Sequence, residues 1–381
     1  FKKRTLYFSV IIAAALYLPH IFWQFNQDFP SLKYHLVERS RGFKWSNLID
    51  YLLNQLPVFN PFTLAAGVYV LFNRKKSDLF ERALKFLMAG VLLFFAVWTF
   101  KSRVEPHWTI VASFPMIILI IRETVENEKL KNYIYKVVAP SLILILVARI
   151  FLIIDILPVK TEWHGDKQKV ADLHAVAGDR PVVFTVGFQM PSKYRFYTGK
   201  EAHGMGALNY RNTQYDIWNF DENYRGKSVV IDLRNDTTGV KPTKSGESVF
   251  NLKEVDEYQP FKKLRVVPFI KNATLSTGKT NELEVTVTND YNNIYYINHK
   301  SMPLQVSLVF ITVIDGKNVF EKVSAETDFE SDEINPGESI KGKIIFNLPD
   351  YTKGEYNVYF TAGTPGVYPA TLEKPQKVIF E

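Results

Sequence analysis

The sequence predicts a multi-domain protein: a polytopic α-helical membrane bundle, then a small α/β layer, then an all-β, immunoglobulin-like sandwich. Three observations predict this fold class. Apolar runs crowd the part before Pro158, the part after it is polar, and from about Lys262 that second part changes from mixed helix and strand patterns to strands alone. We therefore expect a transmembrane bundle at 1–157, an α/β domain at 158–261 and a β-sandwich at 262–381.

Five apolar runs approach the length of a membrane span. A hydrocarbon core of about 30 Å needs roughly 20 apolar residues, and fewer where flanking side chains reach the interface. A soluble helical core is the alternative, but five such helices would keep too little polar surface to face water. The first run is not read as a cleaved signal peptide, because no small-residue cleavage site follows it. The expected spans are 6–23, 56–72, 84–100, 107–121 and 133–157.

Lysine and arginine mark the side on which each loop lies. They precede the first span and recur between the second and third spans and between the fourth and fifth, and such loops are typically cytoplasmic. The N-terminus is then cytoplasmic, and the chain after Pro158 lies outside the cytoplasm. The outer loop 24–55 also carries cations, among them Arg39 and Arg41, which need an explanation of their own.

Composition excludes little else. The net charge of +7 is compatible with an anionic lipid surface, and no basic, aromatic-interleaved motif indicates nucleic acid. The chain has no cysteine, so it carries no disulfide evidence about its compartment. Because Phe1 is not an initiator methionine and lies within a turn of a span, we expect the C-terminal part of a longer membrane protein or a product of unusual processing.

The segment after Pro158 predicts an α/β layer. Residues 167–177 have helical spacing and end at Gly178, and 181–186 and 228–233 have the composition of buried strands. The segment has neither a glycine-rich phosphate loop nor a nucleophile elbow. We therefore assign no active site to it.

The last part alternates strand patterns with turn signals. "LRVVPFI", "ELEVTVTND", "LQVSLVFITVID", "SIKGKIIFNL" and "EYNVYFTAG" are separated by turns such as Asp315-Gly316 and Asn335-Pro336-Gly337. This spacing predicts an antiparallel sandwich resembling an immunoglobulin-like module. Carbohydrate or partner binding is one interpretation and a spacer is the other, because a fold alone implies no function.

The first outer loop, "HIFWQFNQDFPSLKYHLVERSRGFKW", interleaves aromatic and cationic residues. The simpler interpretation is an anchor at the lipid headgroups, where aromatic rings settle and cations meet phosphate. The sharper one is that Arg39 and Arg41 bind a lipid phosphate, since a guanidinium can donate two parallel hydrogen bonds to that anion.

The second outer segment, "KSRVEPHW", interrupts two apolar runs on the same side. Lys101 and Arg103 could join the same anion site, Glu105 could orient one of them or move a proton, and His107 opens the next span. The alternative is structural: a histidine at a helix start is often a hydrogen-bonding residue, and long cationic side chains extend to the interface without binding anything.

Arg149 lies inside the fifth span, about 12 Å from its outer end at 1.5 Å per residue. An ionisable side chain at that depth requires a partner or a watery cavity. Asp155 is six residues away and faces another direction, so it is a poor partner. The side chain either extends to the outer surface or shares a phosphate site with the loops.

Several segments together resemble a known family. "PHIFWQFNQDFPSLKYHLVERS", "KSRVEPHWTIVASFP", "PVVFTVGFQMPSKYRFYTG" and "NYRNTQYDIW" resemble the C-terminal half of bacterial membrane glycosyltransferases of the GT-C class. The pattern is similar to family-39-like enzymes akin to protein O-mannosyltransferases and to the lipid A aminoarabinose transferase. The resemblance covers Phe1 to about Leu233, and the sandwich is an added module.

The resemblance implies transfer of a sugar from a polyprenyl-phosphate carrier to a lipid, glycan or protein acceptor at the periplasmic face of the bacterial inner membrane. The family's catalytic carboxylate lies in an outer loop that would precede Phe1. No cofactor is identified; a divalent metal is possible but not indicated. The proposed lipid-phosphate or substrate site is Arg39, Arg41, Lys101, Arg103, Glu105, His107 and Arg149. A non-enzymatic, membrane-anchored envelope protein whose sandwich binds a partner or glycan is the alternative.

Overall fold

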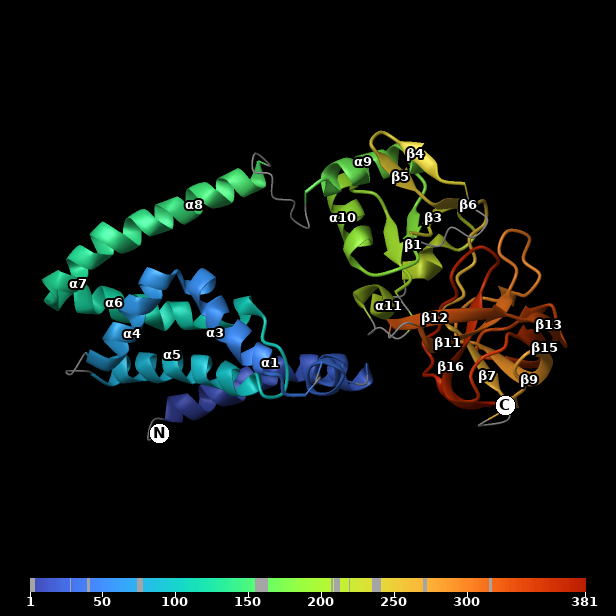
Figure 1. Cartoon of the computed structure of the whole chain (residues 1–381), viewed down its shortest axis with the longest axis horizontal. Helices are drawn as coiled ribbons and strands as arrows, with labels where there is room; N and C mark the ends of the chain where they lie inside the picture. Colours follow the sequence, from blue (N-terminus) through green and yellow to red (C-terminus); the bar gives the residue numbers. More distant parts are fainter. Residues whose placement is uncertain are drawn as a thin grey trace. The chain divides into compact units, whose positions relative to one another are not determined.

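The structure, a computed structural model, combines helices with several β-sheets (Figure 1). It describes residues 4–27, 29–39, 42–73, 78–154, 164–206, 208, 213–218, 220–234, 241–269, 273–314 and 317–381. The chain divides into two compact units, a helical unit Phe1–Glu162 and a mixed unit Trp163–Glu381. Each is described by itself.

The helical unit consists of α-helices joined by short 3-10 and π-helical turns. Its elements are α1 (Arg4–Asn26), α2 (Pro30–Lys33), η1 (Tyr34–Glu38), α3 (Trp45–Phe59), α4 (Pro61–Asn73), α5 (Leu79–Trp98), η2 (Pro106–Ala112), α6 (Ser113–Glu126), α7 (Glu128–Tyr133), η3 (Ile134–Val138) and α8 (Ala139–Ile153). Helices α4, α5 and α6 pack around Val70, Met88, Met116 and Leu119, which are almost completely buried.

Three helical stretches of the described residues are long and apolar enough to cross a membrane: Tyr7–Asn26, Pro106–Glu126 and Glu128–Ile153. They coincide with the predicted spans 6–23, 107–121 and 133–157. Most of the large apolar side chains of α1 and α8 are exposed, as expected for helices whose surroundings are lipid. The chain therefore has features compatible with a membrane protein.

The predicted span 56–72 is not one straight helix. The chain bends by 101° between α3 and α4, and only if this bent pair counts as one span does the number of candidates reach four. Asn60 explains the bend: it has a positive φ of 64°, and its side-chain oxygen accepts hydrogen bonds from the Phe62 and Thr63 amides at 2.9 and 3.3 Å. Asn60 thus caps α4, while Pro61 starts it.

The predicted span 84–100 overlaps α5, which starts earlier, at Leu79, and ends at Trp98. The Asp78 side chain accepts a hydrogen bond from the Glu81 amide at 2.7 Å, which caps the helix. Glu81, Arg82 and Lys85 therefore belong to the helix, and they leave an apolar stretch shorter than the roughly 20 residues that a span requires. The number of candidate spans among the described residues is accordingly below the five predicted.

The mixed unit begins with the predicted α/β layer. Its elements are α9 (Asp166–Ala177), β1 (Val182–Phe184), α10 (Gln189–Thr198), β2 (Ala202–Gly204), α11 (Gln214–Trp218), η4 (Phe220–Tyr224), β3 (Val229–Asp232), β4 (Thr243–Ser245), β5 (Ser248–Phe250) and β6 (Leu252–Val255). One sheet has the order β2-β1-β3-β6, in which β1 is parallel to both neighbours and β6 is antiparallel to β3. Gly178, with φ 61°, ends α9 as expected.

Two further sheets follow, and every predicted strand of this part is present in them. Their strands, with the short β10 and β14, are β7 (Leu264–Pro268), β8 (Thr274–Leu275), β9 (Lys279–Asn289), β10 (Tyr295–Tyr296), β11 (Gln305–Ile314), β12 (Lys317–Ser324), β13 (Glu326–Phe329), β14 (Glu333–Ile334), β15 (Ser339–Leu348), β16 (Gly354–Gly363) and β17 (Gln376–Phe380). The orders are β12-β11-β16-β17-β8 and β13-β15-β9-β7, antiparallel except where β8 joins β17.

One hydrophobic core runs through the mixed unit. It contains Val183 and Ile231 of the α/β layer together with Val287 and Phe310 from the two larger sheets. Polar contacts also join the parts: Tyr291 donates a hydrogen bond to the Asp221 carboxylate at 3.0 Å, and Lys262 pairs with Asp216. The α/β layer and the strands after it therefore form one compact unit in the described residues.

Candidate functional site

The two predicted outer segments meet in the helical unit. The Arg39 guanidinium forms an ion pair with the Glu105 carboxylate and also donates a hydrogen bond to the Arg103 carbonyl oxygen at 3.3 Å. Both charged side chains are partly shielded, with exposed fractions of 17% for Arg39 and 34% for Glu105. Residues 66 positions apart are thus brought into direct contact. We call this contact the 39–105 junction.

An aromatic ring completes the junction. The Arg39 guanidinium carbon lies 4.7 Å from the centroid of the Trp108 ring, a distance typical of a cation–π contact. The Trp108 ring also meets the rings of His35 and Phe95, with centroid distances of 5.7 and 5.8 Å. From the other segment, the Ser102 hydroxyl donates to the Arg39 carbonyl oxygen at 3.1 Å. Side-chain and main-chain contacts therefore both hold the two segments together.

Local sequence explains how Glu105 and Trp108 reach the same place. Glu105 has an extended backbone (φ −75°, ψ 138°) and precedes Pro106, which starts the 3-10 turn η2. Trp108 follows within the first turn. Thr109 then anchors the turn, since its buried hydroxyl donates to the Gln55 side-chain oxygen at 2.8 Å. The polar segment between the two apolar runs is thus a connection between helices that these contacts hold in place.

The other predicted residues of this segment surround the junction without joining its ion pair. The Lys101 ammonium lies 5.6 Å from the centre of the Trp98 ring. The Arg103 side chain is exposed and contributes only its carbonyl oxygen to the junction. His107 is also exposed, and its ring meets the Trp108 ring edge-on at 6.4 Å. Arg41 lies outside the described residues.

Arg149 does not join this group. Its side chain is exposed on α8 and makes no hydrogen bond or ion pair with any part of the chain that the structure describes. Figure 1 shows α8 extending away from the other helices of its unit. The shared phosphate site that sequence suggested for Arg149 and the loops is therefore not formed by these residues.

The junction has a clear chemical consequence. Glu105 balances the charge of Arg39, so Arg39 stabilises the connection rather than presenting a free cation. Lys101 and Arg103 retain their charges at its edge, where an anion could approach. Metal binding has no support in the described ranges, which hold no group of three histidine or acidic side chains close enough to share an ion.

One site escaped the sequence reasoning, at the carboxyl edge of the parallel strands β1 and β3. The Thr185 hydroxyl donates to the Asp232 carbonyl oxygen at 3.1 Å, and the Asp232 carboxylate accepts from the Arg234 amide at 3.0 Å. Burial raises the pKa of Asp232. Ligands of parallel α/β sheets commonly bind at this edge. The buried strand "VVID", which ends in an acid, was the available signal.

An ion pair between α5 and α6 was also not predicted from the sequence. The Glu81 side chain is 1% exposed and meets the Arg122 guanidinium at 2.7 Å, while Arg122 also reaches Asp78 at 2.9 Å. Sequence could not indicate which cation would neutralise Glu81, because Arg122 lies far along the chain.

Comparison with known proteins assigns no family. No family model matches the sequence, and no curated protein matches it significantly. AvmM, which catalyses macrocyclization in alchivemycin A biosynthesis, is similar over 33% of this chain and 93% of its own, with 12% identity and a TM-score of 0.23. The CARDB domain of PF1109 from Pyrococcus furiosus is similar over 32% and 97%, with 14% identity and a TM-score of 0.17.

A β-glucosidase from Listeria innocua is similar over 39% of this chain and 20% of its own, with 13% identity and a TM-score of 0.18. TM-scores of this size support no inference about the fold or the function of this chain. The functional argument therefore depends on the residues themselves.

Proposed function

We propose that this chain is the C-terminal portion of an integral-membrane glycosyltransferase of the GT-C type, in which a sugar passes from a polyprenyl-phosphate carrier to an acceptor at the periplasmic face. The proposal includes a multi-pass inner-membrane bundle with a cytoplasmic N-terminus. It also includes a periplasmic α/β layer and an immunoglobulin-like sandwich. Its support is the sequence resemblance together with the geometry of the 39–105 junction.

The observation that carries the proposal is the meeting of the two outer segments. The sequence pattern assigns both segments to one anion site, and Arg39 contacts Glu105 and the Arg103 carbonyl directly. This arrangement fixes the backbone of the segment that carries Arg103 and Lys101, near the ends of apolar helices. Two cations at that position are suited to the phosphate of a lipid whose chain lies among those helices.

The chemistry assigned to each group follows from its surroundings. In the transfer, the bond between the sugar's anomeric carbon and the carrier phosphate oxygen breaks, and a bond to the acceptor oxygen forms. Arg103 and Lys101 would stabilise the charge that develops on the departing phosphate. Arg39 and Glu105 would position the segment that carries Arg103 and Lys101. The base that takes the acceptor's proton is, by the resemblance, a carboxylate upstream of Phe1.

The test is sugar transfer by the full-length protein in liposomes, from a polyprenyl-phosphate-linked sugar donor. We expect Arg103→Ala to lower kcat/KM by about tenfold or more, because a charge-assisted contact to the leaving group is lost. Lys129→Ala is the matched control: it removes an exposed cation in the connection between α6 and α8, and its activity should equal that of the unmodified protein. Equal activity of Arg103→Ala and the control would contradict the assignment.

A second function is favoured by a different observation. Glu105 already balances Arg39, and Arg149 lies apart from both. Cations in this arrangement would also suit a membrane-anchored envelope protein that has no transferase activity, in which they only extend to the membrane surface. The same sugar-transfer assay distinguishes the two functions. The anchored protein would transfer no sugar at any donor concentration, and its Arg103→Ala variant would keep its membrane association and its melting temperature.

A further inference from the structure

The five-stranded sheet of the mixed unit opens between two central strands. Strands β11 and β16 are paired from Gln305 with Gly363 to Phe310 with Val358, and the ladder stops there. Beyond that point β11 remains paired with β12 and β16 remains paired with β17. The two strands therefore separate in the interior of the sheet, where an unbroken ladder is expected.

Backbone groups face the resulting gap. In an antiparallel ladder the N–H and C=O groups of alternate residues point to opposite sides of the strand. The Ala325 amide donates to the Val306 carbonyl oxygen, so even-numbered residues of β11 point toward β12 and odd-numbered ones toward β16. The next pair in register would be Ile311 and Asn357. The Ile311 carbonyl oxygen and the Asn357 amide face the gap without the bond that would make these two residues a ladder pair.

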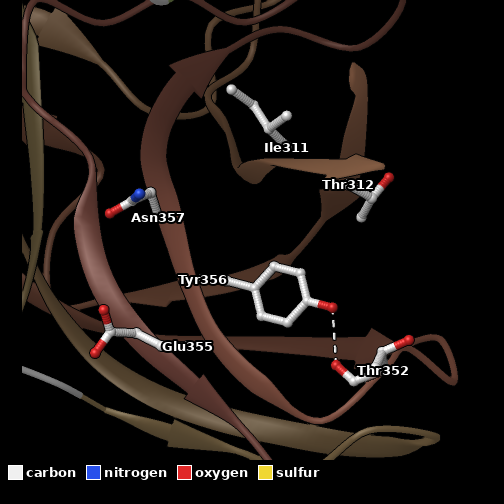
Figure 2. A pocket seen from close by; sticks show the side chains of 6 residues that line it. All are labelled: Ile311, Thr312, Thr352, Glu355, Tyr356 and Asn357. Carbon is white, nitrogen blue, oxygen red and sulfur yellow. Dashed lines mark hydrogen bonds between the residues drawn. The ribbon is translucent and has the colours of Figure 1, made fainter. Parts of the chain in front are cut away.

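The gap is a cleft of about 380 Å³, lined by Ile311, Thr312, Thr352, Glu355, Tyr356 and Asn357. Figure 2 shows the Tyr356 side chain on one side of β16 and those of Glu355 and Asn357 on the other. The Tyr356 hydroxyl donates to the Thr352 carbonyl oxygen at 2.8 Å. One face of its ring stacks on Phe380, with centroids 4.2 Å apart. The ring is thereby fixed in place at the cleft.

One residue that lines the cleft has a hydroxyl without a partner. The Thr312 hydroxyl oxygen is buried and has no hydrogen bond among the described residues. A buried hydroxyl without a partner is unfavourable, and such groups are rare in folded proteins. In Figure 2 the hydroxyl turns away from Tyr356 and the methyl group toward it. Rotation about the Cα–Cβ bond exchanges the two, and a ligand in the cleft would then give the hydroxyl its partner.

The lining selects a neutral ligand that is rich in hydroxyl groups. It offers hydroxyls, an amide and free main-chain groups, which both donate and accept. The Glu355 carboxylate is offset by Lys377, whose ammonium lies 2.7 Å away. Four register pairs, from Ile311 with Asn357 to Ile314 with Gly354, are open, so a short peptide is the competing occupant that the test must exclude. The volume is near the lower end of the range for small-molecule sites.

We propose that this cleft between β11 and β16 binds a neutral saccharide of one or two rings. The site belongs to the mixed unit and uses none of the residues assigned to sugar transfer, so it does not depend on the proposed function. Saccharide binding would survive if the chain proved to have no transferase activity. Loss of transfer in Arg103→Ala would, in turn, leave saccharide binding intact.

The test is saturation-transfer NMR and calorimetry on the full chain with glucose, N-acetylglucosamine and cellobiose at millimolar concentration. The chain is kept in an amine-oxide detergent, because the headgroups of maltoside detergents are themselves disaccharides. Thr312→Val keeps the shape of the side chain and removes its hydroxyl. We expect it to raise the Kd of the bound sugar by about fivefold or more, as for the loss of one hydrogen bond.

The melting temperature of each variant shows whether weaker sugar binding reflects a changed cleft or a less stable fold. Thr312→Val removes an unpaired hydroxyl, so its melting temperature should equal or exceed that of the unmodified protein. Asn357→Ala should also weaken binding, whereas Thr327→Val, on β13 of the other large sheet, should not. The proposal is wrong if no sugar binds, if both cleft variants bind as well as the unmodified protein, or if a Thr-Val repeat peptide binds where no sugar does.

Discussion

Arg39 and Glu105 form an ion pair across the connection between two segments that are distant in sequence, and Trp108 covers the guanidinium at 4.7 Å. The pair has less access to water than most surface ion pairs, and its arginine also donates to a carbonyl oxygen. Its contribution should therefore exceed the small one typical of exposed pairs. It fixes the position of Arg103, which makes it the structural basis of the proposed anion site.

A double-mutant cycle measures that contribution. Arg39→Ala and Glu105→Ala should each lower the stability of the helical unit, and the double variant should lose less than the sum of the two by about 1 kcal/mol or more. Thermal denaturation of the full chain in detergent provides the measurement. The matched control is the exposed pair Lys131 and Glu128, whose coupling should be clearly smaller, because water screens it. Equal couplings would show that the junction is an ordinary surface contact.

Cysteine labelling tests the predicted orientation, and the absence of natural cysteine makes it direct. Arg103→Cys and Lys353→Cys, both at exposed positions, should react with a membrane-impermeant maleimide in intact cells or outward-facing vesicles. Lys129→Cys should react only after the membrane is permeabilised, because the proposal places its loop in the cytoplasm. Labelling of all three positions from the same side would refute the proposed topology.

Close packing of α4 against α6 makes Gly67 sensitive to substitution. A methyl group at Gly67 would lie 2.6 Å from Met116 Cγ, whereas one at Gly90 on α5 would meet nothing within 4 Å. Gly67→Ala should therefore lower stability by about 1 to 3 kcal/mol. Gly90→Ala should leave it unchanged or raise it by up to about 1 kcal/mol, since alanine favours helix. Thermal denaturation followed by helical circular dichroism distinguishes these outcomes.

His203 should make the mixed unit sensitive to acid. Its side chain is buried on β2, its Nδ1 has no hydrogen bond among the described residues, and burial, with Lys262 nearby, lowers its pKa to about 3. The unfolded chain binds a proton near pH 6.5 and the folded chain does not. Stability from this group is thus complete above that pH and falls as the pH drops from about 6.5 toward 3, by up to about 1.4 kcal/mol per pH unit.

The variant that isolates this effect is His203→Phe, which keeps an aromatic ring against the rings of Tyr215 and Tyr224. Melting temperatures between pH 7 and 4 should fall less steeply for this variant than for the unmodified protein. Tyr295→Phe is a suitable control, since its ring is also buried in the mixed unit and does not titrate in this range. Parallel pH profiles for His203→Phe and the unmodified protein would exclude His203 as the source.

Prediction from sequence succeeded where local pattern carries the information. The helix that ends at Gly178, the strands 181–186 and 228–233 and the long strands of the β-rich part are present with shifts of a few residues. Periodicity and turn residues determine such elements. The bend at Asn60 was missed, although "FNPF" contains a capping residue followed by proline, because the apolar side chains on both sides of it favour one continuous span.

Contacts between distant residues needed the folded chain. Sequence indicated that Arg39, Arg103 and Glu105 carry related chemistry, but not that Glu105 would neutralise Arg39 or that Arg149 would stand apart. The same holds for Thr312 and Tyr356. Nothing in the pattern of either strand indicates that their ladder ends four pairs before the strands do.

The sequence by itself determined which segments are apolar, which are strands and where cations interrupt the apolar runs, because these properties depend on neighbours within a few residues. Tertiary structure alone decided which charges are paired, which helices pack against one another and where a sheet opens. Those outcomes depend on distances between groups that are tens of residues apart, and only packing sets these distances.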